Sequence, residues 1–401
     1  MTASQKLKVM VIGRSLPSSS SSYGLFEYNQ AIALSKRELD VTYCFVDGRS
    51  IKVNRTIKSV SFNDENLSVH GKIIPFGGLP LKAKWNIRGR ALCRLLEGEI
   101  TSGKRPDIVY VHFPLLSIAP SFLKRLEIEK IPLLCMEHWS HVQRRILSQK
   151  EEQFLKECVA QSAYYCCVSE DLATSVRALT GCNAQKTPVI SNMISEKVFC
   201  LPHVYENSVN GSDSERYFRF LAMGRLAPNK RFDMLIVAFS KANIPESKLL
   251  IAGAGECERQ LKKQVAALNL EDRIEFLGWK EPEEIATLLQ SCDCYVSASG
   301  DETFGVPFVE AWMCGVPCIG ADNNPLSNYF VDGAGLLFSC DSVLSLSQCL
   351  VDMYNCQASI DTIELSERAT TLFSEESVCS LLVRLFKKTI TENGGSFTFD
   401  K

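Results

Sequence analysis

Two glutamates separated by seven residues, Glu302 and Glu310, flank the start of a predicted helix in the stretch GDETFGVPFVEAWMCGVPC. The first backbone N–H groups of a helix attract anions, because they have no partner within the helix and lie at the positive end of its dipole. Gly305 and Val306 supply such groups here. A neighbouring carboxylate can accept hydrogen bonds from the vicinal hydroxyls of a sugar or a ribose. The segment therefore predicts a pocket for a nucleotide or a sugar phosphate.

Two basic residues, Arg225 and Lys230, follow the predicted strand 218–223 and its terminal glycine. A departing diphosphate builds up negative charge, and fixed Arg and Lys side chains stabilise that charge as it develops. An ordinary solvated loop is the alternative, and it would be preferred for a single cation. The pairing of two cations between a strand and a helix favours a phosphate site.

Several other candidates stand at the ends of predicted strands. Gly253 and Gly255 follow one strand, where glycine permits a tight turn and a close approach to a ligand. His138 follows another strand in the sequence EHWS, and His112 ends a third. A single histidine is more often a structural hydrogen-bonding group than a catalytic one, so the position at a strand end is what makes each a candidate.

Short apolar runs alternate with helical patterns along the chain, which indicates parallel sheets with helices on both faces. The elements predicted in the first half are strands at 7–12, 41–46, 108–112 and 131–136 and a helix at 25–37. The pattern restarts in the second half, with strands at 218–223, 248–252, 273–276, 294–297 and 317–319 and helices at 231–242, 256–268, 283–290 and 307–314. Two α/β units are therefore expected.

A polar stretch separates these two units. Residues 203–217, HVYENSVNGSDSERY, lack apolar periodicity and are predicted to be a surface linker. The expected division is a first domain at 1–202, the linker at 203–217, a second domain at 218–374, and a last helix with a tail at 375–401. Packing of this helix against the first domain is one option.

The composition is that of an ordinary globular protein, with 46% hydrophobic and 22% charged residues. A length of 401 residues exceeds the roughly 250 to 300 at which single cores stop growing. The net charge of −2 argues against wholesale binding to nucleic acid. The 17 cysteines lack zinc-type paired spacing, which indicates buried thiols in a reducing compartment. Without a signal-peptide pattern or an apolar run of about 18 residues, a cytoplasmic location is expected.

One segment is unusually basic. Residues 82–105 carry seven basic residues against two glutamates, together with Trp85. A basic helix with a tryptophan can lie on the inner, anionic face of a membrane or meet an anionic lipid-linked acceptor. An ordinary solvated helix face explains the pattern better, and peripheral membrane contact through 82–105 is kept as the alternative.

The spacing of the two glutamates, with Phe304-Gly305 between them and Glu310-Ala311 followed by Gly315-Val316-Pro317, resembles the EX7E motif of the retaining GT-B glycosyltransferases of family 4. The resemblance is strong over residues 218–340 and weak before residue 200. It implies an α/β fold of the GT-B type, with two Rossmann-like domains facing each other across a cleft. In that arrangement the N-terminal domain binds the acceptor and the C-terminal domain binds the nucleotide-sugar donor.

The resemblance also implies roles for individual residues. Glu302 would contact the donor sugar and Glu310 the ribose of the nucleotide, while Arg225 and Lys230 would bind the diphosphate. A histidine at the position of His138 reaches the donor sugar in several relatives. The remaining residues implied in nucleotide binding are Phe304, Gly305, Val306, Gly253, Gly255 and, in the first loop, Gly24, where relatives often have two glycines.

The implied activity is transfer of a sugar, with retention of anomeric configuration, from a UDP-sugar or GDP-sugar to a hydroxyl of a glycan or lipid-linked acceptor. Polysaccharide or glycolipid assembly is the expected setting. No cofactor or metal ion is expected to be required, because two cations stand at the diphosphate and no DxD-like motif ends a strand of the second domain. The alternatives left open are a GT-B phosphorylase or epimerase, and a sugar-nucleotide-binding protein without turnover.

Overall fold

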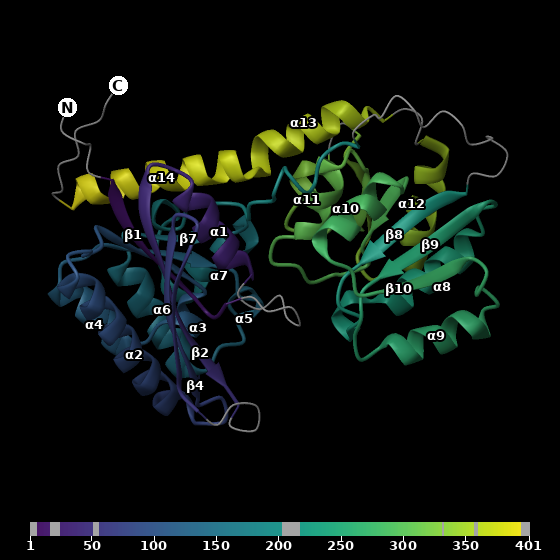
Figure 1. Ribbon diagram of the computed structural model, residues 1–401. Coiled ribbons are helices and arrows are strands. Elements are labelled where there is room, and N and C mark those ends of the chain that lie inside the picture. Colours follow the sequence, from purple (N-terminus) through teal and green to yellow (C-terminus); the bar gives the residue numbers. More distant parts are fainter. Residues whose placement is uncertain are drawn as a thin grey trace. The chain divides into compact units, whose positions relative to one another are not determined.

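The computed structural model describes residues 6–16, 25–50, 56–202, 217–330, 333–356 and 360–393. The chain divides into two compact units, each built on its own sheet (Figure 1). Unit 1 contains Met1–Ser191 and Val378–Lys401, and unit 2 contains Asn192–Ser377. Of the predicted linker at 203–217, only Tyr217 belongs to the described residues.

Unit 1 has a seven-stranded sheet in the order β3-β4-β2-β1-β5-β6-β7. Its strands are β1 (Leu7–Gly13), β2 (Leu39–Arg49), β3 (Lys58–Asp64), β4 (Leu67–Pro75), β5 (Ile108–His112), β6 (Leu133–Glu137) and β7 (Tyr164–Cys167). Neighbouring strands are parallel except β3 and β4, which form an antiparallel hairpin at one edge. The sheet departs from the predicted parallel arrangement only at this edge, where β3 is mostly exposed and carries few apolar residues.

Helices flank this sheet (Figure 1). They are α1 (Leu25–Ser35), α2 (Leu81–Thr101), α3 (Pro114–Ser117), α4 (Pro120–Ile128), α5 (Ser140–Gln143), α6 (Gln149–Gln161) and α7 (Glu170–Thr180). The last helix, α14 (Glu375–Glu392), belongs to unit 1 from Val378 onward. Its Phe386 packs edge-to-face on Tyr110 of β5, with the ring centroids 5.3 Å apart. This contact places α14 against the first sheet.

Unit 2 has six parallel strands in the order β10-β9-β8-β11-β12-β13. The strands are β8 (Phe218–Met223), β9 (Ser247–Ala252), β10 (Ile274–Gly278), β11 (Cys294–Val296), β12 (Cys318–Ala321) and β13 (Gly335–Phe338). The helices are α8 (Phe232–Ala242), α9 (Glu258–Ala267), α10 (Pro282–Gln290), α11 (Val306–Met313), α12 (Val343–Cys356) and α13 (Thr362–Phe373). The sequence had not predicted β13, α12 or α13.

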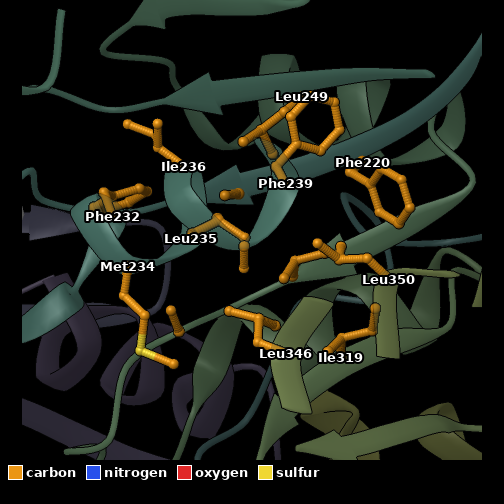
Figure 2. Packing of buried hydrophobic residues seen from close by; sticks show 14 of the residues in the cluster. Phe220, Phe232, Met234, Leu235, Ile236, Phe239, Leu249, Ile319, Leu346 and Leu350 are labelled. Carbon is orange, nitrogen blue, oxygen red and sulfur yellow. The ribbon is translucent and has the colours of Figure 1, made fainter. Parts of the chain in front are cut away.

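The core on one face of this sheet lies between β8, α8 and α12. Figure 2 shows Phe220 of β8 and Phe239 of α8 close together, with Leu350 of α12 nearby, and the two phenylalanine rings meet edge-to-face at 6.1 Å. Full burial of each such side chain stabilises the fold by roughly 1.5 to 3 kcal/mol. This packing fixes β8 and α8, and therefore also the loop between them that carries Arg225 and Lys230.

The order of the strands reverses at the first strand of each unit. β1 lies between β2 and β5, and β8 lies between β9 and β11. In an open α/β sheet such a point leaves a crevice at the carboxyl ends of the strands, and ligands bind there. Lys230 comes from the loop after β8, and Glu302 comes from the loop after β11. The topology alone therefore brings these predicted residues to the same edge.

The loops after β8 and β9 also touch, and glycine permits their approach. Gly253 has a φ of +141°, and a Cβ built on it would lie 1.9 Å from the carbonyl oxygen of Gly224. We predict that Gly253→Ala lowers the free energy of unfolding by about 2 to 4 kcal/mol, through backbone strain and this clash. Denaturation in urea measures the change.

Gly98→Ala serves as the matched control for this prediction. Gly98 lies in α2, and a Cβ built there meets no atom within 4 Å. We expect a gain of about 0.5 to 1 kcal/mol from the higher helix propensity of alanine. A Gly253→Ala protein as stable as the wild type would contradict the packing described here.

Candidate active site

Lys230 and Glu302 form an ion pair at the switch point of the sheet in unit 2. Lys230 ends the short 3₁₀ helix η2 (Pro228–Lys230), and its Nζ lies 2.5 Å from Oε1 of Glu302. Only 26% of the Lys230 side chain and 14% of the Glu302 side chain are exposed. The pair joins two loops that are 72 residues apart in the chain. The structure thus brings together a cation and a carboxylate that the sequence predicted to share a site.

Glu310 lies on α11 between Val309 and Ala311, which are both fully buried. Within the described part of the chain, no hydrogen-bond donor or cation pairs with its carboxylate. Burial raises the pKa of Glu310 to about 7, because the charged form loses hydration. A half-buried carboxyl group without a protein partner is a candidate for contact with a ligand.

The segment before Glu310 shapes the start of α11. Gly305 is the N-cap, with φ 101° and ψ 48°, a left-handed conformation that glycine adopts readily. Val306 is the first helical residue, so the backbone N–H groups of both residues lie at the helix start. The side chain of Phe304 is buried and packs on Phe373, with ring centroids 5.9 Å apart. Phe304 can therefore meet a ligand only through its backbone.

Arg225 has a different partner. Its guanidinium lies 3.0 Å from a carboxylate oxygen of Glu256, and 72% of its side chain is exposed. An exposed ion pair of this kind contributes only about 0 to 1 kcal/mol, so a phosphate could displace Glu256 at little cost. The glycines predicted nearby face protein backbone, since a Cβ on Gly255 would lie 2.4 Å from the carbonyl oxygen of Leu226. Because Gly253 and Gly255 have no side chain, the loops after β8 and β9 can pack closely.

A second cluster lies at the carboxyl ends of β1, β5 and β6 in unit 1. Nε2 of His138 lies 3.0 Å from Nδ1 of His112. The ring of Phe113 stacks on His138 with centroids 4.6 Å apart, and the guanidinium of Arg14 lies 3.5 Å from the centre of the Phe113 ring. Arg14 also pairs with Glu27 at 2.5 Å, where the Glu27 side chain is fully buried. This cluster stands at the switch point of the first sheet.

A buried carboxyl group fixes the turn that carries His138. Glu137 accepts hydrogen bonds from the backbone N–H groups of His138 and Trp139, each at 3.0 Å, and from the hydroxyl of Tyr165 at 2.5 Å. Burial raises the pKa of Glu137, and these hydrogen bonds oppose that shift. Burial also lowers the pKa of His112 to about 4. His112 is therefore neutral at physiological pH.

Arg14 and Glu27 were not among the residues predicted from the sequence. A signal for Arg14 was present, because it directly follows the glycine that ends β1, as Arg225 follows Gly224 after β8. Glu27 gave no such signal, since it is one of many glutamates in helical patterns. Its burial becomes visible only when α1 is placed against the sheet.

Two further predictions concern other parts of the chain. Gly24 lies outside the described residues. The basic segment 82–105 forms most of α2, where Trp85 packs on Phe154 of α6 with ring centroids 5.0 Å apart.

Among the helices that the structure describes, none combines the length and the apolar character needed to span a bilayer. The described residues also contain no group of three or more His, Cys, Asp or Glu that could hold a metal ion.

Comparison with known proteins matches one glycosyltransferase family model to each half of the chain. Residues 28–197 match the family model Glycosyltransferase Family 4, and residues 205–369 match Glycosyl transferases group 1. The N-acetyl-alpha-D-glucosaminyl L-malate synthase of Bacillus anthracis is 26% identical over 55% of this chain and 58% of its own length. The mannosylfructose-phosphate synthase of Agrobacterium fabrum is 34% identical over 30% of this chain and 28% of its own length. The chain thus spans only part of these relatives.

Solved structures resemble the whole chain. HepE from Anabaena, in complex with UDP and glucose, superposes with a TM-score of 0.68 at 18% identity, over 95% of this chain and 100% of that one. The sucrose-phosphate synthase of Thermosynechococcus elongatus gives a TM-score of 0.72 at 16% identity, over 97% and 100% of the two chains. These likenesses confirm the predicted α/β fold of the GT-B type.

The raised pKa of Glu310 leads to a prediction about stability. Between the ordinary value of 4.5 and about 7, the native state holds a proton that the unfolded chain has lost. Stability therefore falls as the pH rises through this window, and levels off above it. We expect Glu310→Gln to exceed the wild type in unfolding free energy by about 1 to 3 kcal/mol at pH 8, and by less at pH 5.

Urea denaturation of both proteins at the two pH values measures this difference. Glu271→Gln is the control, because Glu271 is an exposed loop residue of the same unit. The unfolding free energy of Glu271→Gln should equal that of the wild type at both pH values. If Glu310→Gln showed the same pH dependence as the wild type, Glu310 would not be the group that titrates.

Proposed function

Because the chain belongs to glycosyltransferase family 4, we propose that it transfers a sugar from a nucleoside-diphosphate sugar to an acceptor hydroxyl. The observation that carries this proposal is the Lys230–Glu302 pair at the same edge of the sheet as α11, on which Glu310 has no partner among the described residues. The complexes of HepE with UDP and with UDP-glucose support a donor of this class. A sugar nucleotide needs cations for its diphosphate and acceptors for its hydroxyls, and unit 2 offers both.

The ion pair suits a leaving diphosphate for an electrostatic reason. Before the donor binds, Lys230 and Glu302 neutralise each other, so neither charge is left uncompensated in the partly buried crevice. When the donor binds, Lys230 faces the phosphates and Glu302 accepts hydrogen bonds from sugar hydroxyls. Arg225, released from the exposed Glu256, supplies a second cation as the bond to the phosphate breaks. Each cation thus exchanges a carboxylate partner for a phosphate without leaving the loop after β8.

The helix start and Glu310 suit the nucleotide. The backbone N–H groups of Gly305 and Val306 lie at the positive end of α11 and favour a phosphate oxygen. Glu310 lies in the second turn of that helix and accepts hydrogen bonds from the ribose hydroxyls. These hydroxyls give its carboxylate the donors that it lacks among the described residues. Gly253 and Gly255 act indirectly, by holding the two neighbouring loops together.

The family resemblance extends this proposal to stereochemistry and partners. Retention of configuration follows if the acceptor hydroxyl attacks from the face of the departing phosphate and passes its proton to that phosphate. The donor is a UDP-sugar or a GDP-sugar, and the acceptor a glycan or lipid-linked hydroxyl in polysaccharide or glycolipid assembly. His138 contacts the donor sugar. The relative named from Erwinia amylovora, the amylovoran biosynthesis glycosyltransferase AmsK, is 24% identical over 69% of both chains and supports this setting.

Lys230→Met tests the proposed role of the ion pair. In a screen of UDP-, GDP- and ADP-sugars by thermal shift and product formation, one donor should stabilise the wild type and be slowly hydrolysed without an acceptor. We expect Lys230→Met to reduce kcat for that donor by about 10²- to 10³-fold, since a preorganised charge at the leaving group is lost. NMR of the product anomer tests retention.

Lys262→Met is the matched control, because Lys262 also pairs with a glutamate in unit 2 but on the exposed surface of α9. It should keep the kcat of the wild type. A Lys230→Met enzyme with unchanged turnover would remove Lys230 from the mechanism. Binding of a nucleotide sugar without any turnover would favour a binding protein, and turnover that requires free phosphate would favour a phosphorylase.

A further inference from the structure

His112 and His138 share a hydrogen bond at the carboxyl ends of β5 and β6 in unit 1. Their Nδ1 and Nε2 atoms lie 3.0 Å apart, the ring planes are inclined by 22°, and the ring centroids are 5.2 Å apart. These values describe two nearly coplanar rings that meet nitrogen to nitrogen, which is the geometry of a direct N–H···N hydrogen bond. One proton therefore lies between the rings, and only one ring donates it.

The surroundings of His112 decide which ring donates. His112 is 1% exposed, and its other nitrogen, Nε2, is buried without a hydrogen-bond partner in the described part of the chain. Nearby Glu27 does not accept from it, because Glu27 Oε1 bonds to Arg14 and Glu27 Oε2 has no partner there. A buried N–H without an acceptor is rarer than a lone pair without a donor. The proton of neutral His112 therefore belongs on Nδ1.

We infer that His112 is a positioning residue that fixes the tautomer of His138 by donating its Nδ1–H to Nε2 of His138. The proton of neutral His138 then lies on Nδ1. Other contacts hold His138 in place, since Phe113 stacks on its ring and Glu137 accepts its backbone N–H at 3.0 Å. His112 adds what these contacts do not provide, namely the choice between the two tautomers.

This inference rests on the proposed function, in which His138 contacts the donor sugar. A fixed tautomer makes His138 Nδ1 a hydrogen-bond donor and therefore selects a lone pair of a sugar oxygen as its partner. It also removes the free-energy cost of selecting one of two tautomers when the sugar binds. A loss of His112 should thus weaken donor use even where the fold is unchanged.

Nitrogen NMR of isotope-labelled histidine in the full-length protein tests the tautomer directly, because protonated and unprotonated ring nitrogens resonate in separate regions. The spectrum is recorded at neutral pH without donor, and His138→Gln identifies the signals of His138. We expect Nδ1 of His138 to be protonated and Nε2 unprotonated in the wild type. In His112→Phe, which keeps an aromatic ring beside Tyr110, the two tautomers should mix. A wild type protonated at His138 Nε2, or an unchanged His138 tautomer in His112→Phe, would overturn the inference.

Kinetics distinguish this role from a merely structural one. We expect His112→Phe to lower kcat/KM for the donor by about 10- to 100-fold, and His112→Asn, whose amide can donate in place of Nδ1, to recover most of it. Tyr110→Phe is the matched control, because it removes the hydrogen bond to Gln30 at 2.6 Å but leaves the histidine pair. Equal losses in His112→Phe and Tyr110→Phe would contradict a specific role. If no nucleotide sugar is used at all, the proposed function fails, and the NMR result still decides the tautomer.

Discussion

The arrangement of the candidate site depends on the Lys230–Glu302 ion pair and on the strand order that makes it possible. β8 and β11 are neighbours although their paired residues Leu221 and Tyr295 lie 74 positions apart in the chain (295 − 221), and their carboxyl ends lie at the same edge of the sheet. The pair joins the loops that follow these strands. Loss of one partner from a buried pair leaves the other charge uncompensated and costs roughly 3 to 5 kcal/mol. In this partly buried pair, the two residues therefore contribute to stability as well as to the proposed chemistry.

The two units use the same local pattern with different surroundings. A glycine and an arginine stand in succession at the carboxyl end of each first strand. Arg14 pairs with a buried glutamate and lies over an aromatic ring, whereas Arg225 pairs with Glu256 on the surface. Burial fixes Arg14 in one position and makes it part of the scaffold around His138. Exposure leaves Arg225 able to exchange its partner for a phosphate. The two arginines differ in how they are packed, and the repeated Gly-Arg sequence alone does not reveal this difference.

The sequence predicted best those features that are local. β5 and β8 were predicted from end to end, because each is a continuous apolar run between turn residues. The hairpin of β3 and β4 was missed, since β3 lies exposed at a sheet edge and has little apolar signal. Lys230 and Glu302 were found because both stand near strand ends within recognisable motifs.

Features that depend on which strands are neighbours were beyond the sequence. The His112–His138 hydrogen bond joins the ends of β5 and β6, and the buried Glu27 meets Arg14 only after α1 has docked on the sheet. Phe304 stands within the predicted motif, yet its side chain packs into the interior against Phe373. Spacing along the chain reveals which residues can do chemistry, whereas tertiary packing decides which side chains can reach a ligand.

Amide hydrogen exchange with and without a nucleoside diphosphate tests the central claim most directly, because it locates the bound nucleotide without any substitution. We expect UDP or GDP to slow amide exchange in residues 225–231 and 302–311, which include the loop after β8 and the start of α11. The exchange rates in α2 should stay unchanged. Slowed exchange elsewhere in the chain, with these two segments unaffected by a nucleotide that binds, would contradict this claim.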